Sequence, residues 1–329
     1  MSSQPFFSKE TYIARRQVLK QQVGQGVILL PGNNESSANY KDNWYPFRQD
    51  STFLYYAGII QAGLALVIDA ATGQEILFGD ELSIDDIVWT GPLPSLAELA
   101  AAAGIQKVLP AKEITNYLKG DVLYLPSYRG EQTIAISSWL NKPVQQVQSG
   151  ASVTLIKAIA KQRSCKTEEE LVQIDKACTV TSRMHRAVMM GTKEGMYEYE
   201  ACAIAQKLMW DYHSQNAFLP IVTINGNVLH NHAHGNKLTS GKMLLFDSGT
   251  ELPNGYCGDM TRTIPVDKTF TAKQREIYNV VHASYSKAVS LLQPGVQYRE
   301  VHLAACTVIA EGLKQIGLMK GDVDEAVAA

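Results

Sequence analysis

Residues 242–266, KMLLFDSGTELPNGYCGDMTRTIPV, decide the fold of the second half of the chain. Two strand-like apolar runs flank a single turn-forming cluster, Pro253 to Gly255, so the stretch predicts a β-hairpin. Aspartate is depleted from strands, yet each run contains one, Asp247 and Asp259, six residues from Pro253. A hairpin symmetric about Pro253 predicts Asp247 directly opposite Asp259 on one face, with Cβ atoms about 4.5–5.5 Å apart.

Two carboxylates at that separation repel each other unless a cation lies between them. The pair therefore predicts a divalent metal ion or an ion pair. Two metals about 3.5–4 Å apart would polarise a carbonyl group and deprotonate a bridging water, which is hydrolase chemistry. The alternative is that one aspartate is exposed at a strand end or bonds a turn amide, because one bulge would change the register.

A second cluster of candidate residues is VLHNHAHGN, which contains His230, His232 and His234. The three imidazoles share one face if the segment is extended, where they can bind a metal or shuttle protons. The neighbouring asparagines and glycine instead favour a loop with solvated histidines, so at most one or two are expected to be functional. The remaining histidines fall on expected helices and are predicted to be surface or boundary residues: His185, His213, His282 and His302.

The first half of the chain alternates helical and strand-like segments, which predicts an α/β domain. A helix is expected from Ser8 to Val23. The runs GLALVID (63–69) and EILFG (75–79) predict a hairpin, and SLAELAAAAG predicts a helix that ends at Gly104. The polar, Gln-rich stretch NKPVQQVQSG breaks the periodicity between about Trp139 and Ile156, so a linker is expected there.

Long helices dominate the second half. A capping box of Thr167 and Glu170 predicts a helix running to Gly191, and Thr271 with Gln274 predicts another that runs to about Leu292. Further helices are expected over 196–213 and up to about Ile316, and a third strand over 219–225. The expected domains are residues 1–150 and 151–329.

Composition excludes several classes of protein. The chain has 329 residues, 46% hydrophobic and 19% charged, which fits two globular domains. The 30 Lys plus Arg nearly balance 32 Asp plus Glu, so no nucleic-acid or membrane partner is expected. Five scattered cysteines without CxxC, no signal sequence and no long apolar run predict a cytoplasmic protein. GxGxxG followed by a helix, GxxxxGK[ST] and GxSxG are all absent.

Residues 244–278 resemble the metal-binding hairpin of the pita-bread metallopeptidases, family M24, in the branch of Xaa-Pro aminopeptidases and prolidases. The shared pattern is D-x-G followed by Y-x-x-D-[IM]-T-R-T-x-P. YPFRQDSTFLYYAG (45–58) and IVWTG (87–91) resemble signatures of that branch's N-terminal domain, and GDVDE (321–325) is most similar to bacterial Xaa-Pro aminopeptidases. The resemblance implies an α/β N-terminal domain followed by an α+β pita-bread catalytic domain.

The resemblance also implies roles for individual residues. Asp247 would bind one of two divalent ions, by resemblance Mn²⁺, and Asp259 would bridge both. His230 occupies the position of a catalytic histidine that lines the substrate pocket without binding metal. Trp89 aligns, on weaker grounds, with a tryptophan that approaches a neighbouring subunit's site in oligomeric members. The implied reaction removes an N-terminal residue that precedes proline, in a homodimer or homotetramer.

The family completes its metal site with one histidine and two glutamates that follow the GDVDE-like stretch, and the sequence ends at Ala329 before them. The resemblance therefore implies a catalytic domain incomplete at its C-terminus, which binds metal poorly and gives no turnover. Two alternatives remain. One is a prolidase restricted to Xaa-Pro dipeptides, and the other is a non-catalytic binding protein on the same fold.

Overall fold

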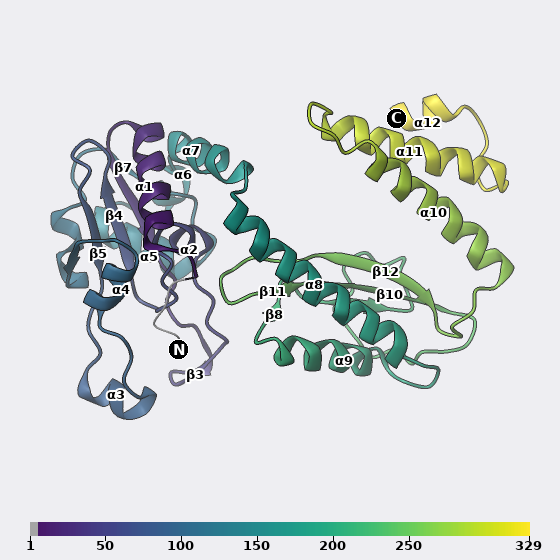
Figure 1. The fold of residues 1–329 in the computed structure, drawn as a ribbon, viewed down its shortest axis with the longest axis horizontal. Coiled ribbons are helices and arrows are strands. Elements are labelled where there is room, and N and C mark those ends of the chain that lie inside the picture. The colour runs from purple at the N-terminus through teal and green to yellow at the C-terminus, as the bar shows by residue number, and fades with distance from the viewer. Residues whose placement is uncertain (1–5) are drawn as a thin grey trace. The chain divides into compact units, whose positions relative to one another are not determined.

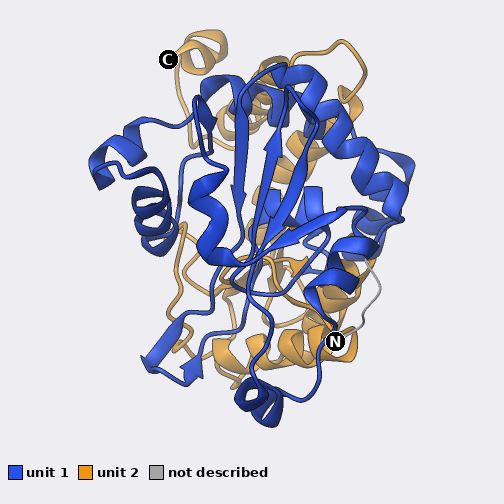
Figure 2. Ribbon diagram, turned by 90° about the vertical axis from the view of Figure 1, so that its left-hand side faces the viewer, with its two compact units in different colours: residues 1–177, 251–257 blue, residues 178–250, 258–329 orange. Residues whose placement is uncertain are grey.

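The computed structural model describes residues 6–329, which form two compact units (Figure 1, Figure 2). Unit 1 contains the chain up to Ala177 together with Glu251–Cys257, and unit 2 contains Cys178–Thr250 and Gly258–Ala329. The division into domains expected from the sequence, 1–150 and 151–329, stays a prediction.

Unit 1 is built on a mixed five-stranded sheet with the order β6-β5-β4-β1-β7. β4 pairs antiparallel with both β1 and β5, whereas β7 is parallel to β1 and β6 is parallel to β5. The β4–β5 hairpin confirms the one predicted from sequence. The strands are β1 (Val27–Pro31), β4 (Ala65–Asp69), β5 (Glu75–Phe78), β6 (Lys107–Leu109) and β7 (Val122–Leu123).

Helices cover both faces of this sheet, which explains why its central strands are apolar at consecutive positions. Ile28 and Leu30 belong to one hydrophobic cluster, and Leu29 between them belongs to the other. The first cluster includes α1 (Lys9–Val23), α2 (Ser51–Ala57), α4 (Leu96–Ala102) and α7 (Val153–Ser164). The second includes the 3₁₀ helix η1 (Ala111–Asn116), α5 (Gly130–Leu140) and α6 (Val144–Ser149).

The predicted linker is wrong. Residues 144–149 form α6, and Val147 is buried among the side chains of the second cluster. The helix is short and buries only this one residue, so the segment shows no apolar periodicity. Its composition therefore looks like that of a linker although it belongs to the core of unit 1.

Two excursions leave the sheet of unit 1. β2 (Ser37–Tyr40) and β3 (Asn43–Trp44) form a small hairpin, and α3 (Ile84–Thr90) is a short helix with no buried residue. The aromatic side chains of this region differ in burial. Trp44 and Tyr45 are exposed, whereas Phe53, Tyr55 and Tyr56 on α2 are buried.

Unit 2 contains a three-stranded antiparallel sheet, ordered β12-β10-β9. Its strands are β9 (Ile221–Thr223), β10 (Met243–Ser248) and β12 (Met260–Pro265), and β8 (Gln215–Asn216) pairs separately with β11 (Thr250–Glu251). Leu244 and Phe246 of β10 pack against buried side chains of α8 (Glu168–Gly191) and α9 (Glu198–Asp211). All three strands and both helices were expected from the sequence.

The last three helices pack mainly on one another (Figure 1). α10 (Ala272–Ser290), α11 (Tyr298–Gln315) and α12 (Val323–Ala328) contribute no side chain to the hydrophobic cluster beneath the sheet. The capping boxes expected at the starts of α8 and α10 are both present. Between residues 6 and 329, no helix has the length and apolar character that crossing a membrane requires.

Candidate functional site

The β10–β12 hairpin sets the relative positions of the two aspartates. Asp247 pairs with Thr261, and a bridge of the same register joins Glu251 to Cys257. The hairpin is therefore centred on Asn254 rather than Pro253. The prediction that Asp247 lies directly opposite Asp259 is wrong by two residues along β12.

The turn explains this offset. The amide of Gly255 donates to the carbonyl oxygen of Leu252 (2.8 Å), and that of Leu252 donates to Tyr256 (3.0 Å). Gly255 has φ +80°, a conformation that glycine adopts without steric cost. Moving the centre by one residue slides the pairing by two, and because side chains alternate with period two, both aspartates stay on one face. They become diagonal neighbours, roughly 7–8 Å apart.

The face that carries the aspartates is the one that α8 and α9 leave uncovered. Leu244, Phe246 and Ser248 alternate as the buried positions of β10. Asp247 lies on the opposite face and is half-buried, and Asp259 is exposed just before β12. Two carboxylates on one open face form a negatively charged surface of the type that hard divalent cations bind.

Gly249 allows the two strands that carry the aspartates to approach each other closely. A Cβ atom added there would collide with the carbonyl oxygen of Gly258 and would lie 3.1 Å from the ring of Phe218. The glycine of the D-x-G pattern thus has a steric explanation. It lets the chain preceding Asp259 pack directly on the chain following Asp247.

The described residues supply only part of a metal site. Asp247 and Asp259 suit a hard cation in donor type. However, residues 6–329 contain no group of three or more His, Cys, Asp or Glu side chains placed to hold one ion. Hard divalent ions such as Mg²⁺ and Ca²⁺ take six or more oxygen donors, so two carboxylates leave most positions to water.

The three clustered histidines do not share the face expected of a strand. Residues 230–236 lie in a turn and an irregular loop after β9. His230 and His232 are exposed, whereas a ring nitrogen of His234 lies 3.0 Å from the carbonyl oxygen of Pro220. The loop reading of this segment is therefore the correct one, and His234 has a local structural contact.

A buried carboxylate that the sequence did not single out holds this histidine loop. Glu198, at the start of α9, is fully buried. Its side chain accepts the amides of Ile224 (2.8 Å) and Asn236 (3.2 Å) and the Nδ2 group of Asn236 (3.0 Å). Both ends of the loop that contains His230 are thus fixed to one side chain.

His185 of α8 was expected at the surface or a boundary, but it is 1% exposed. Its Nε2 lies 3.1 Å from the carbonyl oxygen of Ser248, the neighbour of Asp247, and its ring packs on Phe246 at 4.5 Å. Burial lowers the pKa of this imidazole. His185 therefore supports the strand that carries Asp247 from the face opposite the carboxylate.

Trp89 lies on α3 and is 88% exposed, so unit 1 presents it to solvent. Arg48 and Asp50 do not pair with each other. The Nε of Arg48 forms an ion pair with Glu251 at 2.9 Å, while Asp50 caps α2 by accepting the amides of Thr52 and Phe53. The Arg48–Glu251 pair fixes the start of the hairpin turn within unit 1.

Comparison with known families finds two matches in sequence order. Residues 12–124 match the aminopeptidase P N-terminal domain, and residues 172–324 match metallopeptidase family M24. The matched spans contain all four residues singled out as site candidates, Trp89, His230, Asp247 and Asp259.

Individual relatives give the same result. The chain is 28% identical to a Xaa-Pro aminopeptidase of Escherichia coli, over 98% of this chain and 76% of that protein. It is 29% identical to a probable Xaa-Pro aminopeptidase of Metarhizium acridum, covering 92% of this chain and 61% of the relative. Aminopeptidase PepP of Pseudomonas aeruginosa has a similar structure, with a TM-score of 0.87 and 26% identity over 98% of this chain and 76% of that one. A zinc-substituted E. coli aminopeptidase P in complex with product gives a TM-score of 0.86 at 27% identity, covering 98% and 77%.

Proposed function

Because the chain belongs to metallopeptidase family M24 and carries the aminopeptidase P N-terminal domain ahead of the catalytic one, we propose that it serves the hydrolysis of the bond between an N-terminal residue and a following proline. The observation that carries this proposal is the β10–β12 hairpin, in which Asp247 and Asp259 share the open face of the sheet. The similarity of the fold to aminopeptidase P, which covers 98% of this chain, also supports the proposal.

We assign the roles as follows. Asp247 and Asp259 would hold divalent metal, and when bound the metal would supply an activated water and electrostatic stabilisation of the oxyanion. His230, on the exposed turn after β9, would orient the peptide or donate a hydrogen bond to its scissile carbonyl. Mn²⁺ is the proposed ion, although a neighbouring aminopeptidase P structure is zinc-substituted.

The number of metal ligands predicts the metal affinity and the activity of the 329-residue chain. Because the described residues offer two carboxylates and no third donor placed with them, metal affinity is expected to be low. Catalysis that depends on a firmly held dinuclear centre should then be undetectable.

The test is a peptidase assay with Mn²⁺ on Ala-Pro-Ala, Ala-Pro and Ala-Ala-Ala. The 329-residue chain should release no alanine. A second protein, extended by any coding sequence beyond Ala329, should release it from Ala-Pro-Ala when that sequence adds an HGxxH segment and two glutamates. Hydrolysis by the 329-residue chain would contradict the argument from ligand count. Cleavage of Ala-Pro alone by the extended protein would identify a prolidase, and binding without cleavage a non-catalytic member.

Two further properties remain proposals. The five cysteines are scattered along the sequence and form no CxxC pair, which supports the proposal of a reducing compartment such as the cytoplasm. Trp89, exposed on α3, supports assembly into a homodimer or homotetramer in which an aromatic side chain reaches another subunit. Light scattering on wild type and Trp89→Ala tests the second proposal, since only a contact at Trp89 would make the variant dissociate.

A further inference from the structure

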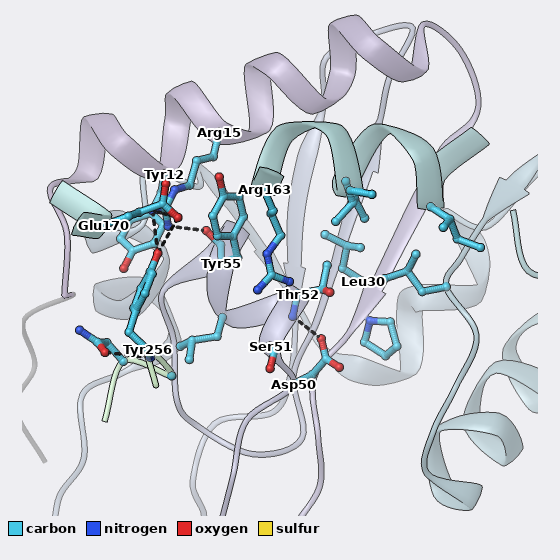
Figure 3. Close-up of a pocket in the computed structure, with 18 of the residues that line it drawn as sticks. Tyr12, Arg15, Leu30, Asp50, Ser51, Thr52, Tyr55, Arg163, Glu170 and Tyr256 are labelled. Carbon is cyan, nitrogen blue, oxygen red and sulfur yellow. Dashed lines mark hydrogen bonds and ion pairs between the residues drawn. The ribbon is translucent and has the colours of Figure 1, made fainter. Parts of the chain in front are cut away.

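Unit 1 contains a cavity that the proposed peptidase reaction does not use (Figure 3). Its volume is about 820 Å³, within the range typical of small-molecule sites. All of its lining residues belong to unit 1. They come from α1, the end of β1, the start of α2, residues 125–132, α7, the start of α8 and the hairpin turn.

Most of the wall is apolar. Leu30 and Pro31 of β1, Leu54 of α2 and Ile156 and Ile159 of α7 line it. Such a wall favours a ligand with a hydrocarbon or aromatic body, because burying apolar surface is the main favourable contribution to its binding.

One cationic side chain in this cavity has no partner. Arg163 extends from α7 toward Ser51 and Thr52 (Figure 3). No group among residues 6–329 forms a hydrogen bond or an ion pair with its guanidinium. The guanidinium carbon lies 5.2 Å from the centre of the Tyr55 ring. An arginine held over an aromatic ring keeps its fork of donors in place for a planar anion.

The other charged residues that line the cavity have partners within the protein. Lys166 is exposed and donates to the backbone carbonyl oxygen of Arg163 (2.7 Å). Asp50 accepts two amides at the start of α2 and the hydroxyl of Tyr128 (3.1 Å). Glu170 accepts the hydroxyl of Tyr256 (2.8 Å) and lies 3.7 Å from Arg15. Among the charged side chains that line the cavity, Arg163 is thus the one whose donors are free to pair with a ligand.

Two hydroxyl groups complete the polar end of the cavity. The Oγ of Ser51 accepts a hydrogen bond from Arg48 (3.1 Å), so its own proton is available for donation. Thr52 follows it at the start of α2, and both side chains line the cavity. A carboxylate carries one negative charge and fits one guanidinium with hydroxyl donors. A phosphate dianion would leave a second charge beside Asp50.

We propose that this cavity binds an organic monocarboxylate with an apolar body, whose carboxylate pairs with Arg163. The carboxylate belongs either to a free organic acid or to the C-terminus of an apolar peptide, and the chemistry is the same in both. This proposal does not rest on the peptidase function.

The experiment is calorimetric titration of the 329-residue chain with phenylbutyrate and with its amide. The acid should bind and the amide should bind about tenfold or more weakly, the loss expected when a charged hydrogen-bond partner is removed. Acetyl-Ala-Phe and its C-terminal amide form a second pair. Tighter binding of the peptide acid than of phenylbutyrate assigns the peptide terminus, and the reverse order assigns the free acid.

Three variants keep the proposal falsifiable. Arg163→Gln should weaken binding of the acid by about tenfold or more while leaving binding of the amide unchanged. Lys161→Gln, an exposed cation on the same helix outside the cavity, should bind as wild type does. Ala160→Trp, which fills part of the cavity, should weaken both ligands. Equal affinity for acid and amide, or undiminished binding of the acid by folded Arg163→Gln, would overturn the proposal.

Discussion

Gly249 illustrates how one missing Cβ atom shapes the candidate metal site. We predict that Gly249→Ala destabilises the protein by roughly 1–3 kcal/mol, the usual cost of overpacking, because the carbonyl oxygen of Gly258 would have to move. Urea unfolding measures this. Gly235→Ala is the matched control, since a Cβ atom there meets nothing within 4 Å and φ is not positive. Equal stability of Gly249→Ala and Gly235→Ala would show that the chain at Gly258 can move away from residue 249 without cost.

Glu170 makes part of the stability of unit 1 dependent on pH. Its side chain is 4% exposed and lies beside Arg15. Burial alone would raise the pKa of this carboxyl, but the Thr167 amide, the Tyr256 hydroxyl and the charge of Arg15 hold it below the ordinary value of 4.5. Because the folded-state pKa is the lower one, the stabilisation is present above pH 4.5 and is lost as pH falls through the folded-state pKa.

Glu170→Gln should therefore destabilise the protein by about 3 kcal/mol near neutral pH, where it leaves Arg15 buried without its carboxylate. The difference from wild type should shrink as the pH falls below the folded-state pKa. Chemical unfolding across the acid range measures it. Glu168→Gln, an exposed neighbour in the first turn of α8, should show little pH-dependent difference. If wild type and Glu170→Gln differed in the free energy of unfolding by the same amount at every pH, the packing of Glu170 rather than its charge would stabilise the protein.

At the residue scale, the sequence identified the aspartates but missed their support. Asp247 and Asp259 stand out because charged residues interrupt apolar strands. Glu198 and His185 give no such signal, since both sit on amphipathic helices where polar residues are ordinary. Their partners are 26–38 and 63 residues away in sequence, so only the tertiary structure reveals their contacts.

At the scale of elements, the loop containing His230 depends on α9. Glu198→Gln keeps one acceptor oxygen and replaces the other with a donor. Because Oε1 accepts the amide of Ile224 and Oε2 accepts that of Asn236, one end of the loop loses its hydrogen bond. We predict that the amide left without its acceptor exchanges hydrogen roughly tenfold faster, as expected for the loss of one such bond. Mass-spectrometric hydrogen exchange resolves peptides over residues 224–236. Asp211→Asn, an exposed change on the same helix, should leave them unaltered. Unchanged hydrogen exchange in Glu198→Gln would show that Glu198 does not hold the loop in place.

Helix starts and hairpins were predictable where local chemistry determines them. Thr167 with Glu170 and Thr271 with Gln274 form the capping boxes that their spacing predicts. The offset of the β10–β12 hairpin was not predictable, because Pro253 and Asn254 are both acceptable turn centres. α6 was missed because a helix with a single buried residue has no period to detect.

At the scale of the whole molecule, the chain forms two compact units that are not continuous in sequence. Glu251–Cys257 belongs to unit 1 although the strands on either side of it belong to unit 2. A tertiary contact explains why this segment belongs to unit 1, because Arg48 forms an ion pair with Glu251, which is 203 residues away in sequence.

We predict that Asp247 and Asp259 together bind divalent metal. Electron paramagnetic resonance of free Mn²⁺ during titration of the 329-residue chain tests it directly. Wild type should bind Mn²⁺ weakly, Asp247→Ala and Asp259→Ala should each weaken that binding by about tenfold or more, and Asp211→Asn should change nothing. Wild-type binding by the double variant Asp247→Ala, Asp259→Ala would contradict the account.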